Sequence, residues 1–474
     1  MRYKKESKGF SFMQKALNLF QRIASDLLED EKKNPVSDYI PVHELYQQID
    51  LALRENPISE QEFESVLREV VFASPRTATP AFFNQLFGGR NETAVLGELL
   101  SVLLNNSMYT YKAAGAAVGV EKAVLREVCN TIGWDNGSDG TFASGGSLTN
   151  FMAMIMARDT TLSDVKNRGM HAPMTVYTSE ESHYSIPKNA AFCGIGRDQV
   201  RYISTDNYGR MIPEELERQI ENDIQEGYIP TLLNLTAGTT VLGAFDSITD
   251  LLPIAKKYNI WTHVDGAYCG SVIFSHKYKH LIGGIKGVDS FSFNAHKMIG
   301  TPLTCSLLLV KNKASLYQSF SNEASYLYQT EGDEFNPGQT SLQCGRRNDA
   351  LKFWALWKSV GTKGLEKIVD KQFALADEAR AYVRNHPDYE LHSFDDSISI
   401  CFSYKDFDAK TLCKELYEQN TLLVSYGEGK TKDFVRMVTI NAQNESSDIL
   451  DFFNSLEQFV QDKTSYQEKA KSIT

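Results

Sequence analysis

The sequence lacks the features of a membrane protein, of a disulfide-stabilised secreted domain and of a nucleic-acid-binding protein. No run of about 18 apolar residues occurs, so a membrane span is not expected. The seven cysteines are scattered and never spaced as CxxC, which disfavours both a disulfide framework and a zinc site. The formal net charge is −11, whereas a phosphate-binding surface needs an excess of cations. We therefore expect a soluble protein that binds neither nucleic acid nor membrane.

Targeting and metal-binding signals are also scarce. The first twenty residues include basic side chains but neither a long apolar core nor a small-residue cleavage site, which favours the cytosol. Among the nine histidines, His276 and His280 stand four apart, but the residues around them offer no carboxylate or thiolate to complete a site. We expect no metal.

What the sequence has is an ordinary globular composition, with 42% hydrophobic and 23% charged residues in a chain of 474. Residues 1–75 have helical periodicity, and Ser59 with Glu62 forms a capping-box pattern. From about residue 142, helical segments alternate with short apolar runs typical of buried strands. These runs are MTVYTS, QVRYIS, TLLNLTAG, WTHVDGAY, SFSFNAH and CSLLLVKN.

This alternation predicts an α/β fold whose central sheet is mostly parallel and covered by helices on both faces. A long helical stretch and the strand-like runs SISICFSY and FVRMVTI follow. We expect three parts: a helical N-terminal segment 1–75, a large domain 76–345 and a smaller C-terminal α+β domain 346–474.

Unusual residues gather at the predicted carboxyl ends of strands, where open α/β sheets bind ligands. Gly145, Gly146 and Ser147 make a turn between a strand and a helix, which suits an anion, although glycine pairs also make turns for steric reasons. Asp265 ends a buried run and needs a cation, either a structural arginine or lysine or a protonated pyridine nitrogen. Lys297 ends another run, and is either an exposed loop residue or a nucleophile that forms a Schiff base.

A Schiff-base lysine, a carboxylate at the ring nitrogen and a phosphate cradle are what pyridoxal 5'-phosphate (PLP) needs. Motifs between about residues 75 and 460 resemble, in order, those of the group II PLP-dependent amino acid decarboxylases. The resemblance is greatest to the glutamate, cysteine sulfinate and aspartate decarboxylase branch. The motifs are FFNQLFGG, TFASGGSLTN, SEESHYSIPKNAA, NLTAGTTVLGAFDSI, HVDGAY, FNAHKMIGTPLTCS, ASYLYQ, LQCGRR and FVRMV.

The resemblance implies a fold-type-I PLP-dependent enzyme with a defined set of cofactor contacts. Lys297 would hold PLP as a Schiff base, and Asp265 would pair with its pyridine nitrogen. His183 would stack on the ring with Ala267 against the opposite face, and Thr236 would lie near the phenolic oxygen. The residues implied for the phosphate are Gly146, Ser147, Asn294 and His296. Taken alone, a histidine such as His183 is more often a core residue.

The resemblance also implies an amino acid substrate with an acidic side chain. Arg436 matches an arginine that binds the substrate α-carboxylate, the alternative being an arginine that faces solvent. Gln85 matches a position near the substrate side chain. Phe87 and the motifs HYSI and ASYLYQ are closer to the cysteine sulfinate and aspartate branch, and Lys112 stands where relatives usually have glutamate. We expect cysteine sulfinate or aspartate ahead of glutamate, because Phe87 would narrow the pocket.

Two further implications concern proton transfer and assembly. Tyr326, in ASYLYQ, would protonate the substrate carbanion at Cα, the alternative being an aromatic anchor of its loop. The enzyme would be a homodimer with its active site at the interface, where the LQCGRR region with Cys344 and Arg346 approaches the partner's cofactor. Plain interdomain packing is the alternative for Cys344 and Arg346.

Three alternatives to an acidic amino acid decarboxylase stay open. They are a decarboxylase of a non-acidic amino acid, another fold-type-I PLP enzyme such as an aminotransferase, and a non-catalytic binding protein. The joint presence of Lys297, Asp265 and His183 argues against the last of these.

Overall fold

The computed structural model describes residues 8–33, 36, 38–321, 333–429 and 432–473. Its contacts divide the chain into two compact units. The first unit combines Met1–Gln85, Ser403–Met437 and Gln443–Thr474, and the second combines Leu86–Phe402 and Val438–Ala442. The three-part division expected from the sequence, with boundaries after residues 75 and 345, stays a prediction.

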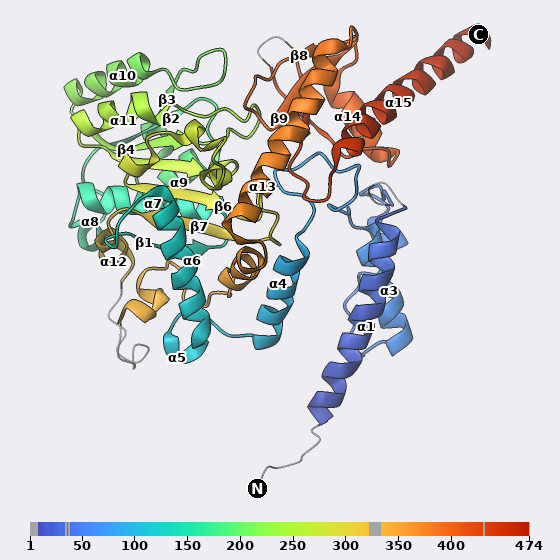
Figure 1. The fold of residues 1–474 in the computed structure, drawn as a ribbon, viewed down its shortest axis with the longest axis horizontal. Coiled ribbons are helices and arrows are strands. Elements are labelled where there is room, and N and C mark those ends of the chain that lie inside the picture. Colours follow the sequence, from blue (N-terminus) through green and yellow to red (C-terminus); the bar gives the residue numbers. More distant parts are fainter. Residues whose placement is uncertain (1–7, 34–35, 37, 322–332, 430–431, 474) are drawn as a thin grey trace. The chain divides into compact units, whose positions relative to one another are not determined.

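A seven-stranded sheet forms the centre of the second unit (Figure 1). Its strand order is β1-β7-β6-β5-β4-β2-β3. Neighbours from β3 to β6 pair in parallel, whereas β7 is antiparallel to both β6 and β1. The strands are β1 (Asp139–Ala143), β2 (Met174–Ser179), β3 (Val200–Ile203), β4 (Ile229–Thr236), β5 (Trp261–Gly266), β6 (Ser290–Asn294) and β7 (Ser306–Val310). The predicted α/β fold with a mostly parallel sheet is confirmed.

The strands of this sheet are buried because helices pack against them. Every residue of β2, β6 and β7 is buried, as expected of strands in a sheet with both faces covered. Helix α7 contacts β4 to β7, and α10 contacts β3 and β4. The helices of this unit are α4 (Glu92–Leu104), α5 (Tyr111–Ala114), α6 (Ala116–Ile132), α7 (Gly146–Thr161), α8 (Val165–Arg168), α9 (Ser185–Phe192), α10 (Pro213–Gln225), α11 (Ile248–Lys257), α12 (Ala314–Phe320) and α13 (Ala350–Asn385).

A smaller sheet is formed by C-terminal strands, as the sequence predicted. Its order is β10-β11-β9-β8, with β8 (Tyr389–Leu391), β9 (Ser399–Tyr404), β10 (Ser425–Gly427) and β11 (Phe434–Val438). Ser59 caps α3 by accepting a hydrogen bond from the Glu62 N–H, so this predicted helix start is confirmed. The helices of the first unit are α1 (Lys8–Asp30), α2 (Leu45–Gln48), α3 (Glu60–Ala73), α14 (Ala409–Glu418) and α15 (Ser446–Ile473).

A buried ion pair joins two distant segments inside the second unit. Arg346 donates from Nη1 and Nη2 to the carboxylate of Glu121 on α6, at 2.8 and 2.7 Å. The two side chains are 3% and 1% exposed. This pairing fits the packing alternative for Arg346, whereas Cys344 is exposed.

We expect Glu121→Gln to lower the free energy of unfolding by about 3–5 kcal/mol, because it leaves the Arg346 guanidinium buried without its counter-charge. The measurement is urea unfolding at fixed protein and cofactor concentration. Glu29→Gln is the matched control. Glu29 pairs with Lys32 on the surface, where solvent screens the pair, so this variant should leave the free energy of unfolding almost unchanged. If both variants lowered the free energy of unfolding equally, burial of the Glu121–Arg346 ion pair would not account for the effect of Glu121→Gln.

Candidate active site

A cavity of about 200 Å³ lies in the second unit where β4, β5 and β6 end. The turn before α7 and the segment after β2 complete its lining. Eight residues that the motifs singled out line it together: Gly146, Ser147, His183, Thr236, Asp265, Ala267, Asn294 and Lys297. The carboxyl ends of parallel strands meet at one edge of a sheet, which is why these residues, far apart in the sequence, converge.

The start of α7 makes one wall of the cavity. Gly145 has φ of 146°, a backbone conformation that favours glycine, and no side chain caps the helix after it. A Cβ on Gly146 would lie 2.9 Å from the Cβ of Ala267, so only glycine allows this approach. The first N–H groups of a helix have no partner within it and attract an anion.

Two buried side-chain oxygens at the cavity, Thr236 Oγ1 and Asn294 Oδ1, have no hydrogen-bond partner among the residues that the structure describes. Buried polar atoms are rarely left unpaired, because each costs free energy. The Thr236 hydroxyl can donate to an anionic ligand, as can the uncapped start of α7, whereas Asn294 Oδ1 can only accept and suits a donor group of a polar ligand.

Asp265 is 5% exposed at the end of β5. Its Oδ2 accepts a hydrogen bond of 2.6 Å from Asn150 Nδ2, and its Oδ1 accepts one of 3.0 Å from the Ala267 N–H. These donors are neutral, and neutral donors compensate a buried carboxylate less well than a cation does. A cationic group of a ligand in the cavity would suit Asp265.

Lys297 is half-buried in the turn between β6 and β7 and lines the cavity. Its backbone N–H donates to the Asn294 carbonyl at 3.0 Å, and its Nζ lies 5.9 Å from the centre of the Tyr268 ring. The side chain is therefore directed to the ligand space rather than held on an exposed loop.

His183 follows β2 and lines the same cavity. Its Nδ1 accepts a hydrogen bond of 3.2 Å from the Ser185 N–H. Burial lowers the pKa of His183, the charge of Asp265 raises it and the charge of Lys297 lowers it. A neutral imidazole facing the ligand is the result.

The remaining predicted residues lie elsewhere or outside the described part of the chain. His296 is buried behind the cavity lining, where its Nδ1 accepts from the Cys305 N–H at 2.9 Å, and burial lowers its pKa to about 3. Phe87 is half-buried and does not line the cavity. Arg436 and Gln85 belong to the first unit. Tyr326 lies outside the described residues, so its role stays a prediction.

Sequence reasoning missed several residues that line the cavity, namely Asn150, Tyr184, Gly238, Thr240 and Tyr268. A signal existed for Asn150, because it stands four residues after Gly146 on the same helix and so shares its face. The others follow predicted residues closely in the sequence but have no spacing that would single them out.

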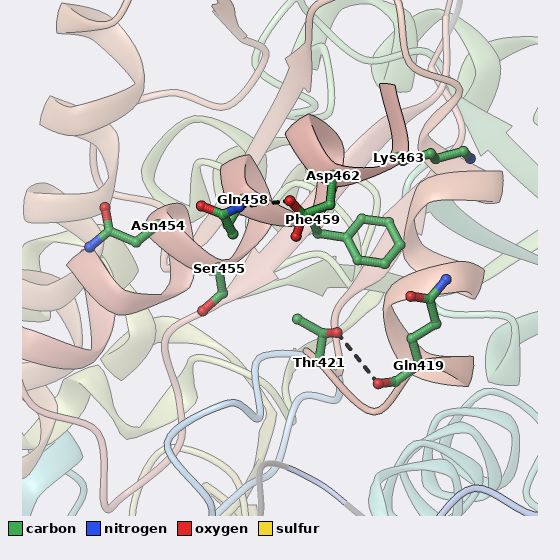
Figure 2. A pocket seen from close by; sticks show the side chains of 8 residues that line it. All are labelled: Gln419, Thr421, Asn454, Ser455, Gln458, Phe459, Asp462 and Lys463. Carbon is green, nitrogen blue, oxygen red and sulfur yellow. Dashed lines mark hydrogen bonds between the residues drawn. The ribbon is translucent and has the colours of Figure 1, made fainter. Parts of the chain in front are cut away.

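A larger cavity, of about 960 Å³, lies in the first unit between α15 and the segment after α14 (Figure 2). Its charged lining residues are Asp462 and Lys463. Asp462 accepts a hydrogen bond from Gln458, and Lys463 forms an ion pair with Glu415. The volume of a cavity therefore does not identify the active site. The polar side chains that converge at the carboxyl ends of β4, β5 and β6 identify it.

The described residues show neither a metal-binding cluster nor a membrane-spanning helix. Within residues 8–321 and 333–473, apart from the short gaps named above, no three histidine, cysteine or acidic side chains are grouped to hold a metal ion. His276, singled out in the sequence, instead contacts Glu366 at 2.8 Å. No described helix has both the length and the apolar composition needed to cross a bilayer.

Comparisons with known proteins agree with the motifs. The model of the pyridoxal-dependent decarboxylase conserved domain matches residues 41–405. The chain is 37% identical to mouse cysteine sulfinic acid decarboxylase, with 90% of this chain and 91% of the relative covered. It is 34% identical to mouse acidic amino acid decarboxylase GADL1, with 94% and 86% covered.

A solved structure is similar over almost the whole chain. The crystal structure of mouse CSAD superposes with a TM-score of 0.90 at 33% identity and covers 95% of this chain and 99% of that one. The predicted family and fold are thus confirmed. The chain belongs to the pyridoxal-dependent decarboxylases and is an amino acid decarboxylase whose cofactor is PLP.

Proposed function

We propose that this enzyme decarboxylates an acidic L-amino acid, cysteine sulfinate, aspartate or glutamate, to the corresponding amine and carbon dioxide. The observation that carries the proposal is the convergence of Lys297, Asp265 and His183 with the uncapped start of α7 in one cavity. The substrate class is supported by relatives named cysteine sulfinic acid decarboxylase and acidic amino acid decarboxylase.

The residues present fit PLP. The start of α7, with Gly146 and Ser147, suits a phosphate, and the unpaired Thr236 hydroxyl suits the phenolic oxygen. Asn294 also lines the cavity and would donate to the phosphate through its amide Nδ2. Lys297 supplies the amine for the covalent link, and Asp265 supplies the negative charge for the pyridine nitrogen. His296, whose Nδ1 accepts from the Cys305 N–H, stays a proposed phosphate residue together with Gly146, Ser147 and Asn294.

When bound, PLP supplies an electron sink for the pair left at Cα when carbon dioxide departs. Asp265 keeps the ring nitrogen protonated, which makes the sink effective. His183 and Ala267 both line the cavity, and they would cover opposite faces of the ring and limit the access of water to the reacting carbon. We keep Tyr326 as the proposed donor of the proton to Cα.

Arg436 is the proposed partner of the substrate α-carboxylate. Its Nε donates to Ser425 Oγ at 2.9 Å, and its Nη2 donates to the Asn84 carbonyl at 3.1 Å, all within the first unit. Such bonds fix the plane of the guanidinium before substrate arrives, which favours bidentate binding. The second bond also fixes the backbone beside Gln85, the proposed neighbour of the substrate side chain.

Substrate choice is tested with a panel of amino acids, following the amine and carbon dioxide formed. We expect cysteine sulfinate and aspartate to be preferred, and glutamate to be slower by about 10- to 200-fold in kcat/KM, the effect of one methylene. Phe87→Ala should reduce the difference in kcat/KM between these substrates and glutamate. Phe63→Ala, which replaces an exposed phenylalanine, should leave this difference unchanged. Decarboxylation of aromatic or aliphatic amino acids alone would refute the acidic class, and keto acid products would favour an aminotransferase.

We also propose a homodimer with the active site at the subunit interface, in which a second copy covers α4. One face of α4 exposes Leu96, Leu99, Leu100, Leu103 and Leu104, each 38–60% exposed at helical spacing. Contiguous apolar patches of this kind are typical of protein interfaces. The exposed Leu342 and Cys344 of the LQCGRR region are available to reach the partner's cofactor site.

Leu100→Asp with Leu103→Asp is expected to convert the dimer to a monomer in analytical ultracentrifugation, with loss of activity in parallel, because charges would be buried at the interface. Leu53→Asp is the control, since Leu53 is fully exposed in the first unit and lies outside this stripe. A monomer of wild-type chain with full activity would refute the dimer.

We propose the cytosol as the working compartment. All seven cysteines are free, and all except Cys344 are buried, as expected of thiols in a reducing compartment. Cell fractionation tests this proposal.

A further inference from the structure

A buried hydrogen-bond network lies beneath the cavity, and Asn150 on α7 is its branch point. Asn150 Nδ2 donates to Asp265 Oδ2 at 2.6 Å and to Ser185 Oγ at 3.1 Å. Asn150 Oδ1 lies 3.1 Å from His263 Nε2. Asn150 is 2% exposed, and Ser185 and His263 are fully buried. Both hydrogens and the oxygen of the one amide are therefore engaged.

The position of the proton on His263 follows from the Asp265 carboxylate, which can only accept. Asn150 therefore presents its amide hydrogens to Asp265 and its oxygen to His263 Nε2. Burial lowers the pKa of His263 to about 4, so the ring is neutral, and its proton lies on Nε2, facing Asn150 Oδ1. At the far side of the ring, Ser290 Oγ lies 2.9 Å from His263 Nδ1 and accepts a hydrogen bond of 2.9 Å from Trp261 Nε1.

The other branch leads to His183. The Ser185 N–H can only donate, and it donates to His183 Nδ1 at 3.2 Å. Ser185 Oγ accepts from Asn150 and gives its hydrogen to the same Nδ1, at 2.8 Å. Neutral His183 therefore carries its proton on Nε2. The Asp265 carboxylate and the His183 branch therefore require the same orientation of the Asn150 amide.

We propose that Asn150 is a positioning residue that orients the Asp265 carboxylate toward the cofactor, while joining it through Ser185 to His183. The proposal rests on the proposed function, because it assigns Asn150 to the site of Lys297. Asp265 Oδ2 receives a charge-assisted hydrogen bond from Asn150 and Oδ1 receives one from the Ala267 N–H, so each oxygen keeps acceptor capacity for the ligand. Asn150 stands one helical turn after Gly146 on α7. The helix whose first turn would bind the phosphate therefore also orients the Asp265 carboxylate toward the pyridine ring.

The test is the dissociation constant of PLP, measured by fluorescence on protein freed of cofactor, with no substrate present. We expect Asn150→Ala to weaken PLP binding by about 10- to 100-fold, the range for losing a hydrogen bond to a charged group. Asn234→Ala is the matched control. Asn234 is a fully buried asparagine of β4 that donates to Thr178 Oγ1 outside this network, and its replacement should change PLP binding by less than about twofold.

A double-mutant cycle separates positioning from general structural support. In the Asp265→Ala background, Asn150→Ala should have almost no further effect on PLP binding, because the residue through which it acts is gone. If Asn150→Ala weakened PLP binding by the same factor with Asp265 present and with Asp265→Ala, the proposal would be overturned. If Asn150→Ala does not fold, the near-isosteric Asn150→Leu serves in the same cycle. Wild-type chain that failed to bind PLP would instead contradict the proposed function, so the two failures are distinguishable.

Discussion

The Lys297→Ala variant is expected to have no detectable turnover and to lack the visible absorbance band of the PLP-loaded wild type. Lys297 lines the cavity from the turn between β6 and β7, and no alanine can form the covalent link to the cofactor. The measurements are carbon dioxide release, the visible spectrum, and mass spectrometry after borohydride. In the wild type, borohydride should remove the band and attach the cofactor to the peptide that contains Lys297.

Two further variants separate the covalent role of Lys297 from its charge. Lys297→Arg keeps a cation without an amine nucleophile, so it should be as inactive as the alanine variant. Lys311→Ala changes an exposed lysine directly after β7 and should retain activity and the visible band. Turnover near the wild-type rate in Lys297→Ala would mean that another residue carries the cofactor.

The Asp265→Asn variant is expected to keep the cofactor but to lose about 10²- to 10³-fold in kcat, or roughly 3–4 kcal/mol. Asparagine fits the space of Asp265 and can still accept the hydrogen bond from Asn150. It carries no charge, so the ring nitrogen is no longer held protonated and the negative charge that develops at Cα is less well stabilised. The measurements are kcat and the stoichiometry of bound PLP.

Asp289→Asn is the matched control for this variant. Asp289 directly precedes β6 and so lies at the amino end of this strand, away from the cavity at its carboxyl end. Its Oδ2 accepts a hydrogen bond of 2.8 Å from the Thr262 N–H. Its replacement should leave kcat within about twofold. If Asp265→Asn retained wild-type kcat with full cofactor, a different group would have to hold the ring nitrogen.

Much of the fold and of the candidate site could be predicted because the determining signals are local. The run MTVYTS is β2, and SFSFNAH contains β6, since short runs rich in β-branched and aromatic residues favour strands. Asp265 and Lys297 were found because each ends such a run, which places it at the ligand-binding edge. The cavity brings them together with His183, as the motifs implied.

Motif matching assigns a role to a position without information on its neighbours. For His296 the structure adds that Nδ1 accepts from the Cys305 N–H, and its contact with phosphate stays a prediction. Phe87 does not line the cavity of Lys297, and its place beside the substrate side chain also stays a prediction. The direction of β7 was equally undetermined, since an apolar run has the same composition whether its strand is parallel or antiparallel.

By itself, the sequence determined the strands and helices, the turn at Gly145, the cap at Ser59 and the family, because hydrogen bonding, sterics and hydrophobic period act over a few residues. Only the tertiary structure decided which distant groups meet. Asn150 contacts Asp265 across 115 positions, and Glu121 contacts Arg346 across 225. Apolar periodicity records that a side chain is buried but not what it touches, and that partner is chosen only when the whole core packs.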